Sequence, residues 1–300
     1  MDAIRLHSPG LDGLRVEELE DPPLGADEAL VEVHAAAITR DELDWPVDRL
    51  PAIPSYELSG VIAAVGREVA GVAAGEAVFA LTPFDRDGVA ATHAAVPANV
   101  LAPKPSMLDH VASAAIPLAG LSAWQGLFDH GRLEAGERVL ITGAAGGVGH
   151  LATQLARGRG AHVIGVVSGH SLELARSLGA HEAIDRTSES LEETVEPVDL
   201  VFDTAGGDLL ERASAVVRPG GRLVSVAEEP PASTEGVDTV FFIVEPNRDQ
   251  LIELARLADS GALKPAIDSV YALSEAREAF ERSLATGKRG KVVLRVLGGD

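Results

Sequence analysis

Residues 138 to 157 read RVLITGAAGGVGHLATQLAR, an apolar run that leads through clustered glycines into a segment with helical spacing. A strand, a glycine turn and a helix in this order are the unit from which open parallel sheets are built. Glycines let the backbone turn sharply and leave no Cβ atom between it and a bound group. The helix N-terminus that comes after the glycines has free N–H groups, which favour an anion. The stretch therefore predicts a phosphate site.

The glycine spacing suits a dinucleotide better than other phosphates. Gly146 would let the backbone approach a pyrophosphate, and Gly149 would let the helix pack closely on the strand. Ala144 stands where the first glycine of the G-x-G-x-x-G motif would be. A purely structural turn is the alternative, which the strand before and the helix after make less favoured.

Two other nucleotide-binding classes are excluded by residues downstream of the turn. A mononucleotide loop needs Lys and Ser or Thr where His150 and Leu151 stand. The TGAAGGVG stretch also fits the short-chain dehydrogenase fingerprint. That family requires a downstream Tyr-x-x-x-Lys, whereas Tyr271 is followed four residues later by Glu275.

Size and charge narrow the class of protein. A chain of 300 residues exceeds the size at which single cores usually stop growing, which predicts two domains. A net charge of −21 disfavours nucleic acid and membrane surfaces as partners. The absence of cysteine excludes disulfides, thiolate zinc sites and a cysteine nucleophile. The opening stretch has no basic and apolar leader pattern, so we expect a cytoplasmic protein.

The pattern along the chain changes near residue 108. Before it, short apolar runs separated by Gly, Pro and Asp indicate a small β-barrel or sandwich. Residues 108–130 have helical spacing, interrupted at Pro117, and we expect the domain junction there. After it, strands alternate with helices at 148–157, 172–178 and 209–217, which is typical of parallel βαβ units. The strands are expected at 138–142, 161–167, 182–184, 198–202, 222–226 and 237–243.

Several stretches carry a family resemblance: IPSYELSGVIAAVG, PANVLAPKP, IPLAGLSAWQGL, the glycine turn itself, LARSLGAHEAIDR and GKRGKVVLRV. Together they span nearly the whole chain, and they resemble the zinc-independent quinone oxidoreductase branch of the medium-chain dehydrogenase/reductase superfamily. The resemblance implies an α/β protein with a GroES-like β-barrel substrate domain (1–119 and 252–300) and a doubly wound, parallel-sheet Rossmann domain (120–251). It also implies a homodimer.

The second strand of the Rossmann pattern indicates which nicotinamide cofactor is bound. An acidic residue at its end would bind the ribose hydroxyls of NAD, but the strand ends in VVSGHS. Ser168, His170 and Ser171, with Arg186 after the third strand, could instead hold a 2′-phosphate. We therefore expect NADPH, with NADH as the alternative. The further cofactor contacts expected from strand-end position or resemblance are Ser122, Ala145, Gly146, Gly147, Val148, Thr204, Ala227, Phe242, Ile243 and Lys291.

The candidate catalytic groups lie in ITRDELDW and IPSYELSG. Zinc members of the superfamily have Gly-His-Glu where this chain has Ser55-Tyr56-Glu57, and the nine histidines are scattered, so we expect no catalytic metal. Without a Lewis acid, an already activated acceptor such as a quinone or an α,β-unsaturated carbonyl is the expected substrate. Thr39 and Tyr56 are the candidate donors to its oxygen, although Tyr56 also suits a buried packing role.

The charged residues Arg40, Asp41, Glu42 and Asp44 are expected to form a solvated turn. Relatives often have Asn at the place of Thr39 and Asp at the place of Glu42. This departure leaves open a second class of function, a cofactor-binding sensor or interaction protein without turnover. A reductase module cut from a polyketide or fatty-acid synthase is a less favoured third possibility.

Overall fold

The computed structural model describes residues 1–46, 48–231 and 236–298. It divides into two compact units, which we call unit 1 (Met1–Leu118 with Glu245–Asp300) and unit 2 (Ala119–Val244). The chain returns to unit 1 at Glu245, before helix α7 (Arg248–Asp259), and this helix packs against strand β7 (Ala102–Pro103) of unit 1. Among the helices of these described ranges, none is long and apolar enough to cross a membrane.

Unit 1 is built around one mostly antiparallel sheet with the order β14-β15-β3-β4-β5-β7, and β6 also pairs with β3. The long strand β3 alternates buried and less buried residues up to His34, as a half-covered strand should, and its last four residues are all buried. β1 and β2 form a separate hairpin. The strands are β1 (Asp2–Leu6), β2 (Leu14–Glu18), β3 (Glu28–Ile38), β4 (Glu57–Val65), β5 (Ala77–Leu81), β6 (His93–Pro97), β7 (Ala102–Pro103), β14 (Ile267–Ala272) and β15 (Lys291–Arg295).

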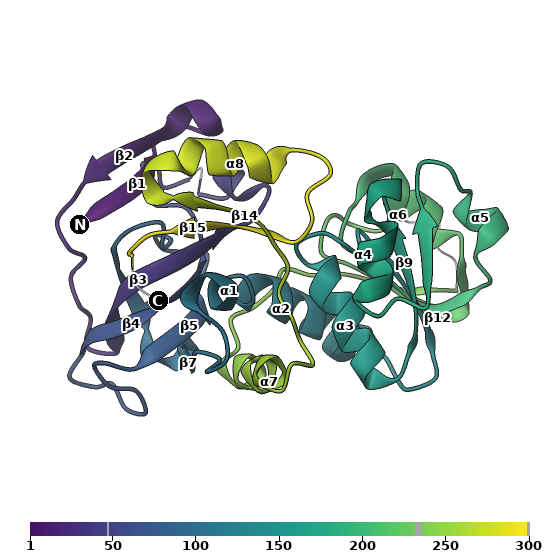
Figure 1. The fold of residues 1–300 in the computed structure, drawn as a ribbon, viewed down its shortest axis with the longest axis horizontal. Helices are drawn as coiled ribbons and strands as arrows, with labels where there is room; N and C mark the ends of the chain where they lie inside the picture. Colours follow the sequence, from purple (N-terminus) through teal and green to yellow (C-terminus); the bar gives the residue numbers. More distant parts are fainter. Residues whose placement is uncertain (47, 232–235, 299–300) are drawn as a thin grey trace. The chain divides into compact units, whose positions relative to one another are not determined.

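The C-terminal segment completes this unit. β15 pairs antiparallel with β3, with Val292 opposite Ile38, so the two ends of the chain share one sheet. Helix α8 (Ala276–Leu284) packs on β14 and β15 (Figure 1). Its residue Phe280 is completely buried. The remaining helical segments of the unit are α1 (His110–Ala114) and the short turns η1 (Leu11–Gly13), η2 (Glu42–Asp44), η3 (Ala98–Val100) and η6 (Leu273–Glu275), with α8 at Ala276–Leu284.

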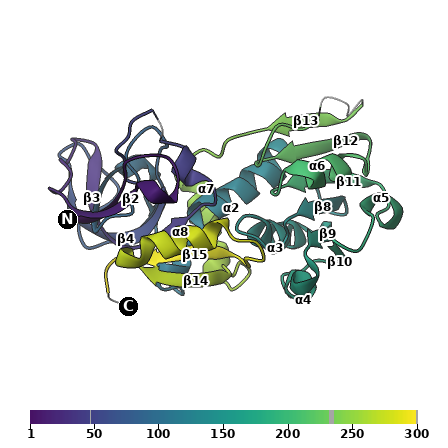
Figure 2. The same ribbon diagram turned by 90° about the horizontal axis from the view of Figure 1, so that it is seen from above.

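Unit 2 contains a parallel sheet of six strands in the order β10-β9-β8-β11-β12-β13, which can be followed in Figure 2. The chain starts in the centre at β8, builds one way through β9 and β10, and then returns to build the other way from β11. This is the strand order of doubly wound dinucleotide-binding sheets. The strands are β8 (Arg138–Thr142), β9 (His162–Val167), β10 (Glu182–Asp185), β11 (Val198–Asp203), β12 (Val217–Ser225) and β13 (Asp238–Phe241).

Helices connect these strands as the sequence pattern predicts, with two differences. The predicted helix at 209–217 ends at Ser214, because Val217 already pairs with Val198 and belongs to β12. The segment 108–130, which has helical spacing in the sequence, forms three separate helical segments, and the last of them is a π-helical turn. The segments are α2 (Pro117–Trp124), the π-turn η4 (Gln125–His130), α3 (Gly149–Arg159), η5 (Gly169–Ser171), α4 (Leu172–Ser177), α5 (Leu191–Thr194) and α6 (Gly207–Ser214).

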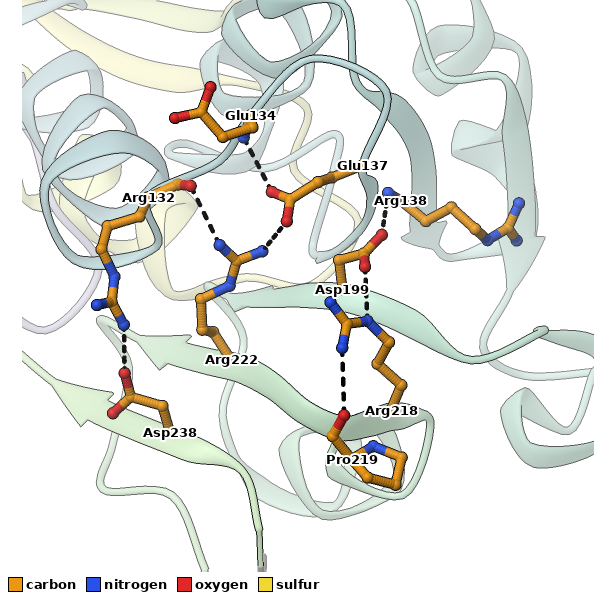
Figure 3. A network of polar contacts seen from close by, with 9 residues as sticks. All are labelled: Arg132, Glu134, Glu137, Arg138, Asp199, Arg218, Pro219, Arg222 and Asp238. Atoms are coloured by element: carbon orange, nitrogen blue, oxygen red, sulfur yellow. Dashed lines mark hydrogen bonds and ion pairs between the residues drawn. The ribbon is translucent and has the colours of Figure 1, made fainter.

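An ion-pair network ties together the strand beginnings of this sheet. Asp199 accepts hydrogen bonds from the Arg138 backbone N–H at 2.7 Å and from Arg218 Nε at 2.6 Å. Arg222 Nη2 donates to Glu137 Oε1 at 2.6 Å. Figure 3 shows the whole set, Arg132, Glu134, Glu137, Arg138, Asp199, Arg218, Pro219, Arg222 and Asp238. These contacts hold the amino edge of the sheet, whereas ligands of such sheets bind at the carboxyl edge.

Candidate functional site

The turn after β8 is held in one conformation by its own backbone. Gly143 has φ of 61°, a region that glycine adopts without strain. The Gly146 N–H donates to Gly143 O at 2.7 Å, and the His150 N–H donates to Gly146 O at 3.2 Å. His150 also donates from its ring Nδ1 to the same carbonyl at 2.8 Å. His150, which the sequence analysis used only to exclude a mononucleotide loop, therefore braces the turn.

A close backbone approach requires glycine at position 149 and leaves little room for a side chain at position 146. A Cβ on Gly149 would lie 2.1 Å from the Gly143 carbonyl oxygen, and one on Gly146 would lie 3.1 Å from it. Gly149 begins α3, a helix of 11 residues whose dipole favours an anion at this end. An open glycine backbone beside a helix N-terminus suits the pyrophosphate of a dinucleotide, so the residues present fit this cofactor.

Asp203 locks the neighbouring strand ends in place. It lies at the end of β11 and is fully buried. Its carboxylate accepts from Thr142 Oγ1 at 2.6 Å and from Ser225 Oγ at 2.9 Å. Its second oxygen also accepts from the Gly206 N–H at 3.1 Å. From the sequence, Asp203 could either cap a turn or contact a ligand. In the structure, its hydrogen bonds join the carboxyl ends of β8, β11 and β12 beside the glycine turn.

Thr204 is fixed by the same strand ends. Its hydroxyl donates to Thr142 O at 2.7 Å, and its N–H donates to Thr142 Oγ1 at 2.9 Å. Of the other residues predicted to contact the cofactor, Ser122 and Ala145 are buried and Ala227 is exposed. Phe242 is buried with its ring 4.4 Å from that of His130, whereas Ile243 is 69% exposed. The prediction that both line the nicotinamide remains untested.

The loop after β9 contains the residues expected at the adenosine end. Arg186 Nε donates to Ser168 Oγ at 3.3 Å, so these two predicted residues are neighbours. His170 is exposed, and Ser171 is buried at the end of the short turn η5. No carboxylate follows β9 in the sequence, but Asp185 of β10 lies beside the loop.

Asp185 reaches the loop because β10 pairs with β9 and places Asp185 opposite Val167. A Cβ on Gly169 would lie 2.6 Å from Asp185 Oδ2. Hydrogen bonds from the Thr187 N–H and hydroxyl, and further ones from Ser188 and Gly169, lower the pKa of Asp185 and keep it ionised. Asp185 could have been predicted to lie beside this loop, because it is an acidic residue at the end of the next parallel strand.

In unit 1, a compact polar cluster joins the end of β3 to the beginnings of β4 and β15. We call Thr39, Glu42, Glu57 and Lys291 the Thr39 cluster. Lys291 is 4% exposed, and its ammonium donates to Glu57 Oε1 and, at 3.3 Å, to Thr39 Oγ1. Glu57 is fully buried and accepts from the Leu118 N–H at 2.9 Å. Thr39 is half-buried and is the only member that is not fully enclosed.

Glu42 corrects the expected solvated turn. It is fully buried, because its Oε2 folds back to accept the Thr39 N–H at 3.0 Å, and its Oε1 has no hydrogen-bond partner among the described residues. Burial raises the pKa of Glu42 to about 8, against the opposing effects of the Thr39 N–H and the Lys291 charge. Glu42 is therefore a neutral acid at pH 7, and only Arg40, Asp41 and Asp44 of the predicted turn are exposed.

Tyr56 is enclosed in an aromatic group. It is fully buried, and its hydroxyl accepts from Arg49 Nη2 at 2.8 Å. Its ring centroid lies 5.7 Å from that of Trp45 and 5.2 Å from that of Phe84. Burial raises the pKa of the Tyr56 phenol. This environment favours the packing role over the catalytic one, which remains a prediction.

Within the described ranges, no three His, Asp or Glu side chains are arranged so that they could hold a metal ion. At the place where zinc members have Gly-His-Glu, Glu57 forms an ion pair with Lys291 instead. A zinc site uses thiolate, imidazole or carboxylate ligands that are not already paired with another group. The carboxylate of Glu57, paired with Lys291, does not resemble such a ligand.

The strand order and the glycine turn together define unit 2 as a sheet of the dinucleotide-binding class. Residues 25–106 match the alcohol dehydrogenase GroES-like domain, and residues 178–294 match the zinc-binding dehydrogenase family. The chain is 33% identical to an NADPH-dependent alkenal/one oxidoreductase of Arabidopsis thaliana, over 95% of the chain and 76% of the relative. It is also 33% identical to a probable zinc-binding oxidoreductase of Arthroderma benhamiae, over 92% and 90%.

The chain therefore belongs to the medium-chain dehydrogenase/reductase superfamily. Among solved structures, the quinone oxidoreductase from Coxiella burnetii superposes with a TM-score of 0.92 at 28% identity, covering 99% of both chains. The predicted family and the predicted fold, a GroES-like domain with a Rossmann domain, are confirmed. The protein is an oxidoreductase of this superfamily with a fold suited to NAD(P)H.

Proposed function

We propose that this protein reduces quinones or α,β-unsaturated carbonyls with NADPH and without a metal. The observation that carries the proposal is the glycine turn, which leaves an open backbone beside the N-terminus of α3 at the carboxyl edge of the sheet. The names of an alkenal/one oxidoreductase and a quinone oxidoreductase among the relatives support this acceptor class. The bound cofactor would supply a hydride from C4 of its nicotinamide.

The dinucleotide is assigned to unit 2. Gly147 and Val148 would present backbone N–H groups to the pyrophosphate, and Gly146, whose own N–H donates to Gly143 O, would let the backbone approach it. His150 and Asp203 keep the turn and the strand ends fixed. Rigid donors of this kind need no reorganisation when an anion binds. Ser168 and Arg186 would take the 2′-phosphate that distinguishes NADPH from NADH.

The acceptor oxygen is assigned to Thr39 in unit 1. When hydride adds to an enone or a quinone, negative charge develops on that oxygen, and a fixed hydrogen-bond donor lowers the barrier. The Thr39 hydroxyl accepts from Lys291, so its own proton is available for the acceptor. The Tyr56 hydroxyl also accepts its bond, from Arg49, but Tyr56 is fully buried and cannot meet the acceptor in the same way.

The test is turnover together with a variant of the glycine turn. Purified protein mixed with NADPH and a panel of enals, enones and benzo- and naphthoquinones should oxidise the cofactor. Gly146→Ala should raise the Kd for NADPH by about tenfold, because the added methyl group fills the backbone approach. Gly158→Ala in α3, the helix after the turn, is the matched control, since its Cβ would meet nothing within 4 Å.

Two outcomes would redirect the proposal. Tight NADPH binding without turnover on any acceptor would favour the alternative, a cofactor-binding sensor on the same fold. No binding of NADPH or NADH at all would contradict both.

Two further properties belong to the proposal. A homodimer is supported by β13, a sheet-edge strand that pairs only with β12 among the described residues and bears the half-exposed Phe241. Light scattering on the eluting protein would test it, and a mass near 31 kDa would contradict it. A cytoplasmic location stays a prediction, because relatives named as mitochondrial and chloroplastic show that the family is not confined there.

A further inference from the structure

The sheet of unit 1 brings Lys291 and Thr39 together although they are far apart in the sequence. β15 pairs with β3 with Val292 opposite Ile38, and Lys291 and Thr39 are the residues next to this last pair in the sequence. On the other side of β3, Glu57 of β4 lies opposite Ala37. Three adjacent strands therefore carry an acceptor carboxylate, a buried ammonium and a hydroxyl at one end of the sheet.

The ammonium is held where it is by Glu57. A buried charge is stable only when it is paired and its hydrogen bonds are satisfied. Glu57 receives Lys291 on Oε1 and the Leu118 N–H on Oε2, so both carboxylate oxygens are used. The long side chain of Lys291 is consequently held in one position, whereas the side chain of a surface lysine moves freely in solvent.

We propose that Lys291 is a positioning residue for the reduction, whose ammonium orients the Thr39 hydroxyl toward the acceptor oxygen. This inference rests on the proposed function. It gives Lys291 a role different from the cofactor contact that the family resemblance implies for it.

The direction of the hydrogen bond supports this role. An ammonium can only donate, so the Lys291–Thr39 bond of 3.3 Å uses a lone pair of Thr39 Oγ1 and leaves the hydroxyl proton for another acceptor. Within the described part of the chain, none of the hydrogen bonds of Thr39 uses this proton: its N–H donates to Glu42, its carbonyl oxygen accepts from the Glu42 N–H, and its Oγ1 accepts from Lys291. Because Thr39 is the half-buried member of the Thr39 cluster, its hydroxyl is the one group there that a substrate can approach.

The remaining charges around Thr39 leave the effect of the ammonium intact. Glu57 faces Lys291 from β4, and Asp41 lies exposed on the turn. Glu42 lies under Thr39 as a neutral acid, since burial raises its pKa. A hydroxyl polarised by a neighbouring cation donates a stronger hydrogen bond, and such bonds matter most in a site shielded from water.

The chemical step balances. The acceptor carbon takes a hydride with its electron pair from the bound cofactor, and the π electrons of the acceptor move onto its oxygen. The Thr39 hydroxyl donates a hydrogen bond to that oxygen as the charge develops. One proton from solvent completes the reduced product, and Thr39 and Lys291 keep all their protons.

The experiment compares kcat, KM and NADPH affinity in four variants. Thr39→Val removes the hydroxyl and should lower kcat by about 10- to 100-fold, whereas Thr39→Ser should retain most of it. Lys291→Met combined with Glu57→Gln removes both buried charges and should lower kcat similarly, with the Kd for NADPH unchanged. Adding Thr39→Val to that pair should have little further effect, because Lys291 acts through Thr39.

Contrary outcomes are specific. If the paired variant binds NADPH more weakly but keeps its kcat, Lys291 contacts the cofactor and the proposal is overturned. The proposal is also overturned if adding Thr39→Val to the paired variant lowers kcat by the same factor as Thr39→Val does alone. If the paired variant does not fold, Lys291→Arg keeps the charge and must retain Thr39-dependent turnover. If the wild-type protein shows no turnover on any acceptor, it is the proposed function that fails.

Discussion

Replacing Glu42 with glutamine should abolish a large pH dependence of stability. The carboxyl group is fully buried, and one of its oxygens has no hydrogen-bond partner in the described ranges. Glutamine has nearly the same shape and can still accept the Thr39 N–H, but it cannot ionise. The variant therefore isolates the free energy of keeping this one acid protonated.

The magnitude follows from the two pKa values. Burial raises the pKa of Glu42 from 4.5 to about 8, so the folded state holds the proton more tightly than the unfolded chain. The associated stability is complete below the unfolded pKa and is lost as the pH rises through the folded one. At about 1.36 kcal/mol per pH unit, the free energy of unfolding should fall by about 3 kcal/mol between about pH 5 and pH 7.5.

Urea unfolding of both proteins across this pH range measures the effect. All other titrating groups are shared, so the difference between wild type and Glu42→Gln cancels their contributions. The wild type should lose about 3 kcal/mol relative to the variant as the pH rises. Parallel stability curves for the two proteins would refute the reasoning, because they would mean that Glu42 ionises normally in the folded state.

Three further predictions concern other parts of the chain. Burial, together with His34 and Lys104, lowers the pKa of His110 to about 4. Wild type should therefore lose up to about 2 kcal/mol more than His110→Asn between about pH 7 and pH 5 in urea titrations. Asp185→Asn removes a negative charge beside the loop and should raise the ratio of NADPH to NADH affinity about threefold. Arg186→Ala should lower this ratio. Calorimetry with each cofactor measures both changes. Ser55 is buried at φ of 68° and donates to Ala37 O at 2.6 Å. Ser55→Gly should therefore be more stable than Ser55→Ala by about 1 kcal/mol in chemical unfolding, since both lose the bond but only glycine relieves the backbone.

The parts of the fold that sequence predicted are those with local causes. The strand at 138–142 and the helix after the glycines follow from apolar periodicity and from the backbone requirements of the turn, all within about 20 residues. The strands of unit 2 were found for the same reason. The helix predicted to continue to Val217 was wrong at its end because pairing with β11 decides where β12 begins.

The polar groups that depend on strand pairing could not be predicted. Thr39, Glu57 and Lys291 meet only because β4 and β15 flank β3. Asp185 reaches the loop after β9 only because β10 lies beside β9. Glu42 reads as a surface residue in a charged run, and its burial follows from its bond to the Thr39 N–H. Each of these depends on register between distant segments, which composition and spacing do not encode.

The most direct test of hydride transfer from a dinucleotide held at the glycine turn uses NADPH deuterated at C4, prepared separately in its R and S forms. Incubated with the protein and an accepted enone, one of the two forms should deliver deuterium to the β-carbon of the saturated product. In Gly146→Ala this transfer should slow at limiting cofactor, while Gly158→Ala should match the wild type. Product without deuterium from either form, or equal transfer by all three proteins at limiting cofactor, would contradict the assignment.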